Sequence, residues 1–448
     1  MSSHVRSVSR RRIAAAMFLV TALGILAGCG TGNTSSTADA ASRACDVAAP
    51  AEPQTVNILA FSAPSIDPFT DAIVKGCSAA DNLTLNHTPV DFTGQIQKAQ
   101  LALGSEGNSP YDVVEVYNST LVEYASKGWV APLDDYISKY EDKYQLGDVS
   151  EEAWAGVTYD GKIYAVPNQV NTQILIYRKD LFEAEGLSAP TTYEELVAAA
   201  SKLGGKVDYP LSMAWGSDDA LLDGFHGWLA AGGGKWFNDD NTPAFDSPEG
   251  RKGLEQMKGL LPFMPKDTLS FGNGDVMGLM QQGKVGMAII WASRAAPIND
   301  PNASKVAGKV GFAPAPRGMS GIPAGENSVD GFAIAKNSAV DPETLFQIVA
   351  STTLNKDVQR DASEVVLPAR MSVQNDTSAA QPHWGASFEN IAGGAQALPA
   401  VPFMDPLTKS VVNPFLAKAV TGALPVDAAL RQASAALNKT LLDQGHLK

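Results

Sequence analysis

Cysteine and histidine are scarce in this chain, which has 3 cysteines and 5 histidines among 448 residues. They are scattered, so they offer none of the close ligand spacings that hold a transition metal. No G-x-S-x-G motif presents a serine nucleophile, and no pair of carboxylates can be nominated by motif as a catalytic acid and base. We therefore expect no metal site, no cofactor and no enzymatic activity.

Positive charge is also in deficit, with 34 Lys and Arg against 48 Asp and Glu, a formal net charge of −14. A surface of this sign repels the phosphate backbone of nucleic acids, so we expect no nucleic-acid partner. The apolar content of 45% is still high enough for real hydrophobic cores. Because single cores seldom grow beyond roughly 250 to 300 residues, two domains are expected.

Long apolar runs are missing apart from Ile13 to Ile25, which is shorter than the about 20 residues needed to span a membrane. Four arginines precede this run, at positions 6, 10, 11 and 12, which is the layout of an export signal. Residues 1–28 are therefore predicted to be a signal peptide, exported by the Sec or the twin-arginine route. Its removal takes away those four arginines and no acid, which shifts the net charge from −14 to −18.

The stretch Leu26-Ala27-Gly28-Cys29 resembles the lipobox of bacterial lipoproteins, in which the cysteine thiol receives a diacylglyceryl group. The resemblance implies an exported protein whose Cys29 is lipid-anchored to the outer face of the cell membrane. Residues 29–45 are small and polar, so they are predicted to be a flexible tether. An ordinary secretory signal, with Cys29 incidental, is the alternative.

Cys45 and Cys77 stand 32 positions apart in a chain predicted to enter an oxidising compartment, which favours a disulfide. Closing a loop of that size stabilises the fold by about 3 to 4 kcal/mol. Two free buried thiols are the alternative.

Strand-like and helix-like segments alternate from residue 55 to residue 118, which predicts a parallel sheet with helical crossovers. We expect strands over 55–61, 83–92 and 111–118 and helices over 69–80 and 96–105, followed by a hairpin over 159–164 and a largely helical C-terminal third. Ligands of such sheets meet the carboxyl ends of the strands. These ends are Phe61-Ser62, Asp91-Phe92 and Tyr117-Asn118.

Four stretches, in this order, resemble the extracellular solute-binding proteins that serve ABC importers of sugars and polyols, the relatives of maltose-binding protein. The stretches are "YDGKIYAVPNQVNTQILIYRKDLFEAEGL" (159–187), "MQQGKVGMAIIWASRAAP" (280–297), "KVGFAPAPRG" (309–318) and "VVLPARMSV" (365–373). The resemblance covers nearly the whole chain after the tether. It implies a monomeric receptor that delivers a small neutral carbohydrate or polyol to the permease subunits of an importer.

The fold that the resemblance implies is α/β and bilobal, a clam-shell of two α/β domains joined by a multi-strand hinge. Three crossings between the lobes are expected, near 168–171, near 313–316 and near 366–368. The N-terminal lobe would comprise residues 46–170 and 314–365, and the C-terminal lobe residues 171–313 and 366–448. Pairing the crossings in this way permits closure by hinge motion of a few backbone positions.

A cleft for polyhydroxylated ligands needs aromatic planes for C–H faces and amide, carboxylate or guanidinium groups for hydroxyls. The strand ends supply Phe61, Ser62, Tyr117 and Asn118 as candidates. The resemblance adds Asn171, at a position where relatives carry a polar sugar contact, and Gln173 would share its strand face. A hinge residue that only satisfies backbone groups is the alternative for Asn171.

The resemblance also nominates aromatic and charged residues in the second half of the chain. Trp215 follows a strand where relatives present an aromatic ring, and Trp291 and Arg294 follow the strand "VGMAII". A fixed fork of donors suits vicinal hydroxyls, so Arg294 is the stronger candidate, with a surface salt bridge as the alternative. Trp228 and Trp236 are predicted to be core.

Three further candidates come from segments that match the family farther along the chain. Asp330 and Phe332 are candidates on either side of Gly331, where relatives are Gly-rich and aromatic, and a carboxylate there favours hydroxyl donors over anionic ligands. Arg370 falls at the third crossing, where it contacts ligand or pairs with a carboxylate.

Two other functions remain open from the sequence. One is a secreted carbohydrate-active hydrolase. The other is the same fold with a non-sugar ligand, such as a glycerol phosphate, which would need several converging cations, or a quaternary amine, which would need an aromatic cage.

Overall fold

The computed structural model describes residues 45–216, 220–377 and 380–447. The predicted signal peptide, the lipidation candidate Cys29 and nearly all of the predicted tether lie outside these residues. Within the described residues, no helix combines the length and the apolar character needed to cross a bilayer.

The main sheet has the strand order β2-β1-β3-β10-β6-β8-β7, with β9 and β11 paired to β6. The strands are β1 (Gln54–Phe61), β2 (Leu83–Val90), β3 (Val113–Tyr117), β4 (Thr158–Tyr159), β5 (Lys162–Ile163), β6 (Ala165–Arg178), β7 (Tyr209–Met213), β8 (Val285–Trp291), β9 (Val310–Ala313), β10 (Asn327–Ile334) and β11 (Leu367–Pro368). β1 pairs in parallel with both β2 and β3, which confirms the predicted parallel arrangement of the first three strands.

Helices cover both faces of this sheet. The helices are α2 (Asp67–Gly76), α3 (Phe92–Leu103), α4 (Asn118–Ser126), α5 (Asp134–Tyr144), α6 (Glu151–Gly156), α7 (Lys179–Ala184), α8 (Tyr193–Leu203), α9 (Ala220–Ala231), α10 (Pro248–Leu260), α11 (Asn273–Gln281), α12 (Ala295–Asn299), α13 (Pro342–Thr353), α14 (Lys356–Ala362), α15 (Met371–Thr377), α16 (Pro382–Ala392), α17 (Met404–Leu407), α18 (Asn413–Val420) and α19 (Val426–Asp443). The largely helical C-terminal third is therefore confirmed.

Local sequence explains several of these boundaries. Asp91 ends the β2 segment and caps α3, because its carboxylate accepts a hydrogen bond from the Gly94 backbone N at 2.8 Å. Asp160 and Gly161 connect β4 and β5 with φ angles of 48° and 72°, the left-handed conformation that a tight two-residue hairpin requires. The predicted hairpin is confirmed.

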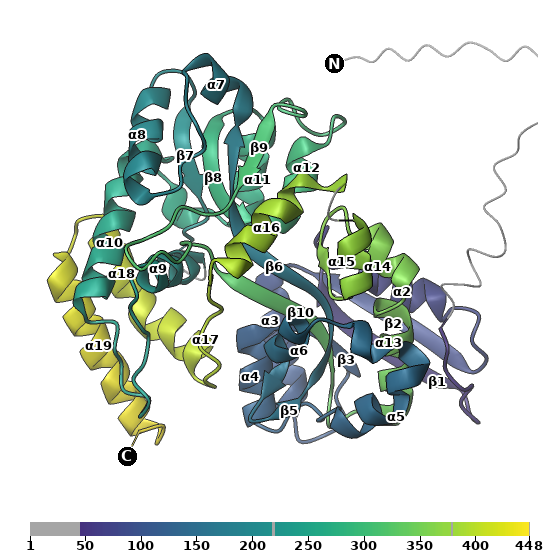
Figure 1. The fold of residues 1–448 in the computed structure, drawn as a ribbon. Helices are drawn as coiled ribbons and strands as arrows, with labels where there is room; N and C mark the ends of the chain where they lie inside the picture. Colours follow the sequence, from purple (N-terminus) through teal and green to yellow (C-terminus); the bar gives the residue numbers. More distant parts are fainter. Residues whose placement is uncertain (1–44, 217–219, 378–379, 448) are drawn as a thin grey trace, which may run out of the picture.

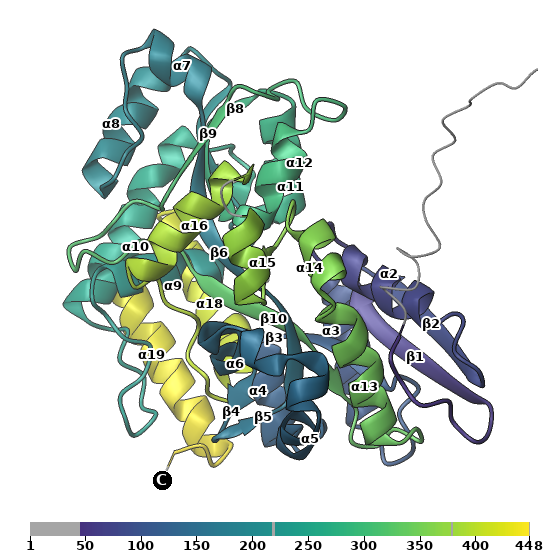
Figure 2. The same ribbon diagram turned by 45° about the vertical axis from the view of Figure 1, so that its right-hand side comes forward.

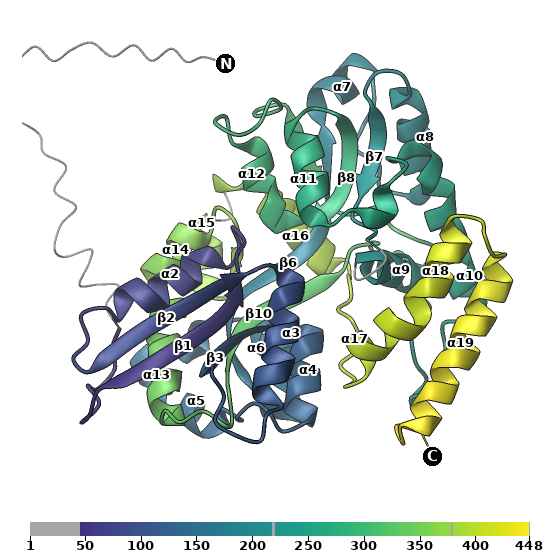
Figure 3. The same cartoon turned by 180° about the vertical axis from the view of Figure 1, so that it is seen from behind.

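The elements form two lobes, and Figures 1 and 3 show β6 passing from one to the other. The first lobe contains β1, β2, β3, β10, α2–α6 and α13–α15, and the second contains β7, β8, β9, α7–α12 and α16–α19 (Figure 2). β6 pairs with β10 of the first lobe up to Thr172 and with β8 of the second lobe from Gln173 onward. The α/β bilobal fold is confirmed, and β6 changes from the first lobe to the second between Thr172 and Gln173.

The second crossing lies later in the chain than predicted. Residues 314–326, assigned from the sequence to the N-terminal lobe, make their contacts with the second lobe. The backbone N of Arg317 donates to Thr191 O at 2.8 Å, and that of Ser320 donates to Ala231 O at 3.1 Å. The chain returns only where β10 begins, because β9 and β10 pair with different halves of β6 and the loop between them stays on the second lobe.

The third crossing is also displaced. β11 pairs with the first-lobe half of β6, and the backbone N of Ser150 donates to Ala369 O at 2.9 Å. Ser372 Oγ donates to Asp148 at 2.6 Å, which holds α15 on the first lobe. We therefore place this crossing between α15 and α16 rather than at 366–368.

The structure contains the predicted disulfide between Cys45 and Cys77, with their Cα atoms 4.7 Å apart. The backbone N of Cys45 also donates to Gly76 O at 3.0 Å. The segment that precedes β1 is thereby joined to the C-terminal end of α2, and the alternative of two free thiols is excluded.

Candidate functional site

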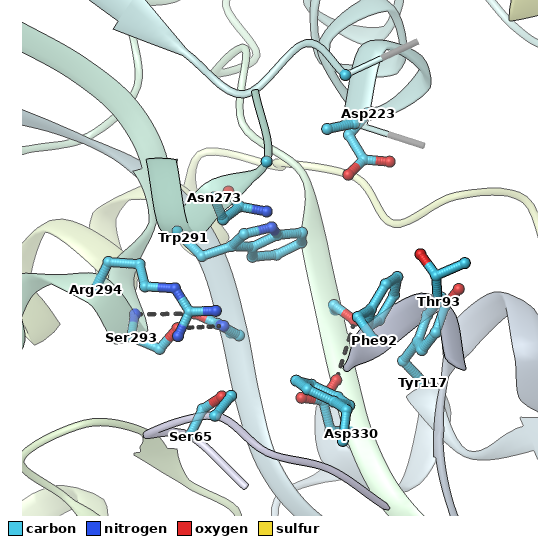
Figure 4. A pocket seen from close by; sticks show the side chains of 18 of the residues that line it. Ser65, Phe92, Thr93, Tyr117, Asp223, Asn273, Trp291, Ser293, Arg294 and Asp330 are labelled. Carbon is cyan, nitrogen blue, oxygen red and sulfur yellow. Dashed lines mark hydrogen bonds between the residues drawn. The ribbon is translucent and has the colours of Figure 1, made fainter. Parts of the chain in front are cut away.

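A cavity of about 510 Å³ lies between the two lobes, within the range of 300 to 1,000 Å³ usual for small-molecule sites. Figure 4 shows side chains from both lobes directed into it. The side chains from the first lobe include Phe61, Ser62, Ser65, Asp91, Phe92, Thr93, Tyr117 and Asp330. Those from the second lobe include Asp223, Phe271, Asn273, Trp291, Ser293, Arg294, Leu398, Asp405 and Lys409.

Strand ends place much of this lining. β1, β2 and β3 are parallel, so their carboxyl ends meet at one edge of the sheet and deliver Phe61, Phe92 and Tyr117 there. On the opposite wall β8 ends at Trp291, and the short helix η4 (Ala292–Arg294) turns Ser293 and Arg294 toward the same space.

Aromatic rings form two surfaces facing the cavity. On the first lobe, the Phe61 and Phe92 rings meet edge to face at 5.2 Å, and the Phe92 and Tyr117 rings stack at 5.4 Å. Trp291 stands on the second lobe, across the cavity from Phe92 (Figure 4). Flat apolar surfaces of this kind suit the C–H faces of a sugar or polyol.

Asn171 lies at the hinge, where its side chain is fixed by the second lobe. Its Nδ2 donates to Ser293 Oγ at 3.1 Å, while its Oδ1 accepts from the backbone N of Thr172 at 3.1 Å and of Ser293 at 3.4 Å. Asn171 therefore satisfies backbone groups, which is one of the two readings of the sequence, and it also lines the cavity.

Asp330 is buried on β10 at the floor of the cavity. Its carboxylate accepts a hydrogen bond from Gln169 Nε2 at 2.6 Å and one from Ser328 Oγ at 3.5 Å. Burial raises the pKa of Asp330 to about 7, although Ser328, Arg294 and Gln169 act in the opposite direction. Glu115, two residues before Tyr117 on β3, is fully buried, and burial together with the charge of Asp330 raises its pKa well above the ordinary value.

Arg294 has hydrogen-bonding capacity left over. Its Nε and Nη1 atoms are buried and have no hydrogen-bond partner among the described residues. Burial lowers the pKa of Arg294, and the charge of Asp330 counteracts this effect. Because buried donors without acceptors are costly, these atoms indicate that a ligand or water supplies acceptors in the cavity.

Seven residues that the sequence nominated lie in the cavity lining: Phe61, Ser62, Tyr117, Asn171, Trp291, Arg294 and Asp330. Asn118 does not line it, because its side chain accepts from Val329 N at 2.9 Å and donates to Asn327 O at 3.4 Å, which fastens α4 to β10. Gln173 lies beside the cavity but not in its lining, in a strand position where its backbone N donates to Glu326 O.

The other three nominated residues are structural in their surroundings. Trp215 and Phe332 are completely buried in the hydrophobic cores of the second and first lobes. Arg370 is buried in the first lobe, where it donates to Leu354 O, to Gln145 O at 2.8 Å and to Tyr144 O at 2.6 Å and pairs with Asp148 at 3.4 Å. Trp228 and Trp236 are buried, as predicted.

Several residues of the cavity lining were not among those nominated from the sequence. Phe92 was placed at a strand end together with Phe61 and Tyr117 but was not nominated as a ligand contact. Asp223, Phe271, Asn273, Asp405 and Lys409 come from helices and turns of the second lobe, and no local pattern marks them. No group of three or more metal-ligating side chains occurs in the part of the chain that the structure describes.

A comparison with curated proteins finds relatives among bacterial binding proteins. The mannitol-binding protein of Pseudomonas aeruginosa is 28% identical over 231 residues, which cover 49% of this chain and 51% of that protein. A binding protein of Brucella abortus is 26% identical over 229 residues, covering 50% of this chain and 54% of that protein. The chain therefore matches about half the length of these curated relatives.

Solved structures share the fold over a larger part of the chain. A solute-binding protein of Agrobacterium radiobacter in complex with ribitol superimposes with a TM-score of 0.76 at 23% identity, covering 87% of this chain and 100% of that chain. One from Agrobacterium vitis with bound D-mannitol gives a TM-score of 0.76 at 24% identity, covering 87% and 99%. The family model described as bacterial extracellular solute-binding protein matches residues 68–345. The chain belongs to this family of bacterial extracellular solute-binding proteins.

Proposed function

We propose that this protein captures a small neutral carbohydrate or sugar alcohol in the interlobe cavity and delivers it, unaltered, to the permease of an ABC importer. One observation carries the proposal: aromatic faces and hydroxyl-binding groups from two lobes surround one cavity of ligand size. We assign ligand contact to the seven nominated residues of the lining, Phe61, Ser62, Tyr117, Asn171, Trp291, Arg294 and Asp330.

The charges of the lining favour a neutral ligand over an anionic one. Five carboxylates among the described lining residues, Asp91, Asp223, Glu326, Asp330 and Asp405, face two cations, Arg294 and Lys409. A phosphate or carboxylate on the ligand would meet repulsion from this set. Hydroxyl groups can donate to the carboxylates and accept from Arg294, so they suit both signs of charge.

Relatives that bind mannitol and ribitol support the polyol side of the proposal. The family membership supports binding without chemistry and partnership with importer subunits.

The family membership also supports an extracellular location, with the lipid on Cys29 as the proposed anchor. Incorporation of radiolabelled palmitate into the wild type but not into Cys29→Ala would support that anchor, and equal labelling of both would contradict it.

A ligand screen tests the main proposal. Thermal unfolding is followed with D-mannitol, ribitol, maltose, glycerol 3-phosphate and choline, and binding is then measured by isothermal titration calorimetry. A neutral ligand at 100 times its Kd should stabilise the protein by about 2.7 kcal/mol.

The proposal expects 1:1 binding of a polyol or sugar that is recovered chemically unchanged. Stabilisation only by glycerol 3-phosphate or choline, or release of hydrolysis products from a glycoside, would contradict it.

A further inference from the structure

Three side chains form a contact between the lobes, away from the strands that connect them. Tyr117 Oη donates a hydrogen bond to Asp405 Oδ2 at 2.9 Å. Lys409 Nζ donates to the same oxygen at 3.0 Å and lies 3.5 Å from Tyr117 Oη. We name this group the Tyr117–Asp405–Lys409 bridge.

The members of the bridge belong to different lobes. Tyr117 ends β3 and directly precedes α4, next to the core of the first lobe. Asp405 lies on α17, whose Met404 and Leu407 are buried in the core of the second lobe. Figures 1 and 3 both show α17 reaching toward α4. Opening of the lobes therefore requires the bridge to break, while the connecting strands can stay intact.

The backbone around Lys409 has an unusual conformation. Residues Thr408–Val412 form a π-helical turn between α17 and α18. Such turns are rare and occur frequently at functional sites. Here the turn holds Lys409 on the same side as Asp405, so that both reach Tyr117.

Burial distinguishes the bridge from ordinary surface ion pairs. The side chains of Lys409 and Asp405 are 20% and 7% exposed, whereas those of the ion pair Lys75–Asp71 are 75% and 61% exposed. Water screens an exposed pair strongly and a buried one much less. The bridge therefore contributes more to holding its partners together than a surface pair would.

Cavities lie on both sides of the bridge. Asp405 and Lys409 line the main cavity and also a second cavity of about 270 Å³ between α3, α4 and α17. The hydrogen bonds of the bridge therefore join the lobes at a place that has a cavity on each side.

We propose that the Tyr117–Asp405–Lys409 bridge is a latch that holds the lobes closed before any ligand arrives. This inference goes beyond the proposed function, because it concerns the ligand-free protein. The latch sets the fraction of molecules in the closed form. The apparent Kd of any ligand that needs the closed form equals its intrinsic Kd divided by that fraction.

The test measures the distance between the lobes without ligand. Spin labels on unnatural amino acids replace Glu141 on α5 of the first lobe and Lys202 on α8 of the second lobe, two exposed positions. Double electron–electron resonance then compares the wild type with Tyr117→Phe and Lys409→Met. We expect one short distance in the wild type and a longer distance for at least half of the molecules in each variant.

Matched controls remove the same groups within one lobe. Tyr140→Phe removes a tyrosine hydroxyl that donates to Glu343, and Lys439→Met removes a lysine paired with Asp443 four residues away. Both controls should keep the wild-type distance. Circular dichroism verifies that all variants fold, and Tyr117→Phe and Lys409→Met must agree with each other.

Two results would overturn the latch. One is an unchanged distance distribution in both bridge variants, and the other is a wild type that is already open without ligand. These distances are measured without ligand, so the test of the latch remains decisive even if no compound in the ligand screen binds. If D-mannitol binds, the bridge variants should lose roughly threefold to tenfold in affinity and regain the short distance at saturation. Lower affinity with an unmoved ligand-free distance would show direct ligand contact instead.

Discussion

The charged guanidinium group of Arg294 is not fully hydrogen-bonded by the described residues of the protein. Its position after β8 directs the guanidinium into the cavity, where burial lowers its pKa and the nearby opposite charge of Asp330 partly counteracts that effect. Nε and Nη1 still have no acceptor among the described residues. Ligand oxygens can fill this need, so Arg294 should contribute more to ligand affinity than to stability.

Replacing Arg294 tests this argument. Hydrogen bonds to a charged group are each worth about 1.5 to 3 kcal/mol, so Arg294→Gln should weaken binding of D-mannitol roughly 10- to 150-fold. Isothermal titration calorimetry measures the change. Arg251→Gln, which breaks an exposed pair with Asp427, is the control and should bind as the wild type does. Equal affinities of Arg294→Gln and wild type would remove Arg294 from the site.

Asp330 should make stability depend on pH. Burial raises its pKa from 3.8 to about 7, so between these values the folded chain retains a proton that the unfolded chain releases. The stability contributed by this group is fully present below pH 3.8 and is lost as the pH rises through about 7.

The variant Asp330→Asn removes this titration, while Glu115 and Arg294 remain beside it. We therefore predict a change in slope: between pH 5 and pH 8 the wild type should lose roughly 1 to 3 kcal/mol of unfolding free energy relative to the variant. Urea unfolding at several pH values measures this difference. The exposed Asp208→Asn is the control, and parallel pH profiles of Asp330→Asn and wild type would refute the prediction.

The rule that ligands meet strand ends located part of the cavity lining from sequence. It placed Phe61, Phe92 and Tyr117 correctly at one edge of the sheet, although Phe92 was not nominated as a ligand contact. The resemblance to the family did not locate Trp215, whose ring lies in the second core after β7 and packs against Gly224 on α9. Asp405 and Lys409 could not be predicted, since the contact that makes them relevant joins segments almost 300 positions apart in the sequence.

At the scale of elements, Arg370 fastens several segments of the first lobe. It donates to the backbone of Leu354 after α13, and of Tyr144 and Gln145 at the end of α5. One side chain thereby satisfies carbonyls at the ends of two helices, which have no partner within the helix. Of the two readings of Arg370 from the sequence, pairing with a carboxylate is the one the structure shows, with Asp148 at 3.4 Å, whereas the backbone carbonyls it also serves were not predicted.

Arg370→Met should therefore destabilise the fold without altering the cavity. Losing buried, charge-assisted hydrogen bonds costs roughly 2 to 4 kcal/mol, which urea unfolding followed by circular dichroism can measure. Arg360→Met, which breaks an exposed pair with Asp357, should cost less than about 1 kcal/mol. The Kd for D-mannitol should change less than threefold in both variants. A stable Arg370→Met with weakened binding would return Arg370 to the ligand site.

At the scale of the whole molecule, the lobes are less separate than their outline suggests. The two lobes predicted from the sequence are confirmed, whereas the contacts of residues 314–326 and of α15 put the second and third crossings later in the chain than predicted. The lobe on which a loop packs depends on long-range contacts, such as those of Arg317 and Ser320, and local sequence does not encode these contacts. The same long-range packing extends the first hydrophobic core into the second lobe, where Val285, Ala288 and Ile290 of β8 belong to it.

A core shared across β6 predicts that the lobes unfold together. Labelling with 5-fluorotryptophan allows ¹⁹F NMR to follow each lobe during urea unfolding, with Trp129 and Trp154 in the first and Trp215, Trp228 and Trp236 in the second. The midpoints should coincide, as in a two-state transition.

Ile290→Ala removes buried volume from the second-lobe side of the shared core, at a cost of about 2 to 5 kcal/mol. Ile290→Ala should lower the urea midpoints of both lobes equally, because packing lost on one side of a shared core destabilises the other side as well. If only the second-lobe signals moved, the lobes would be independent folding units joined by a passive hinge.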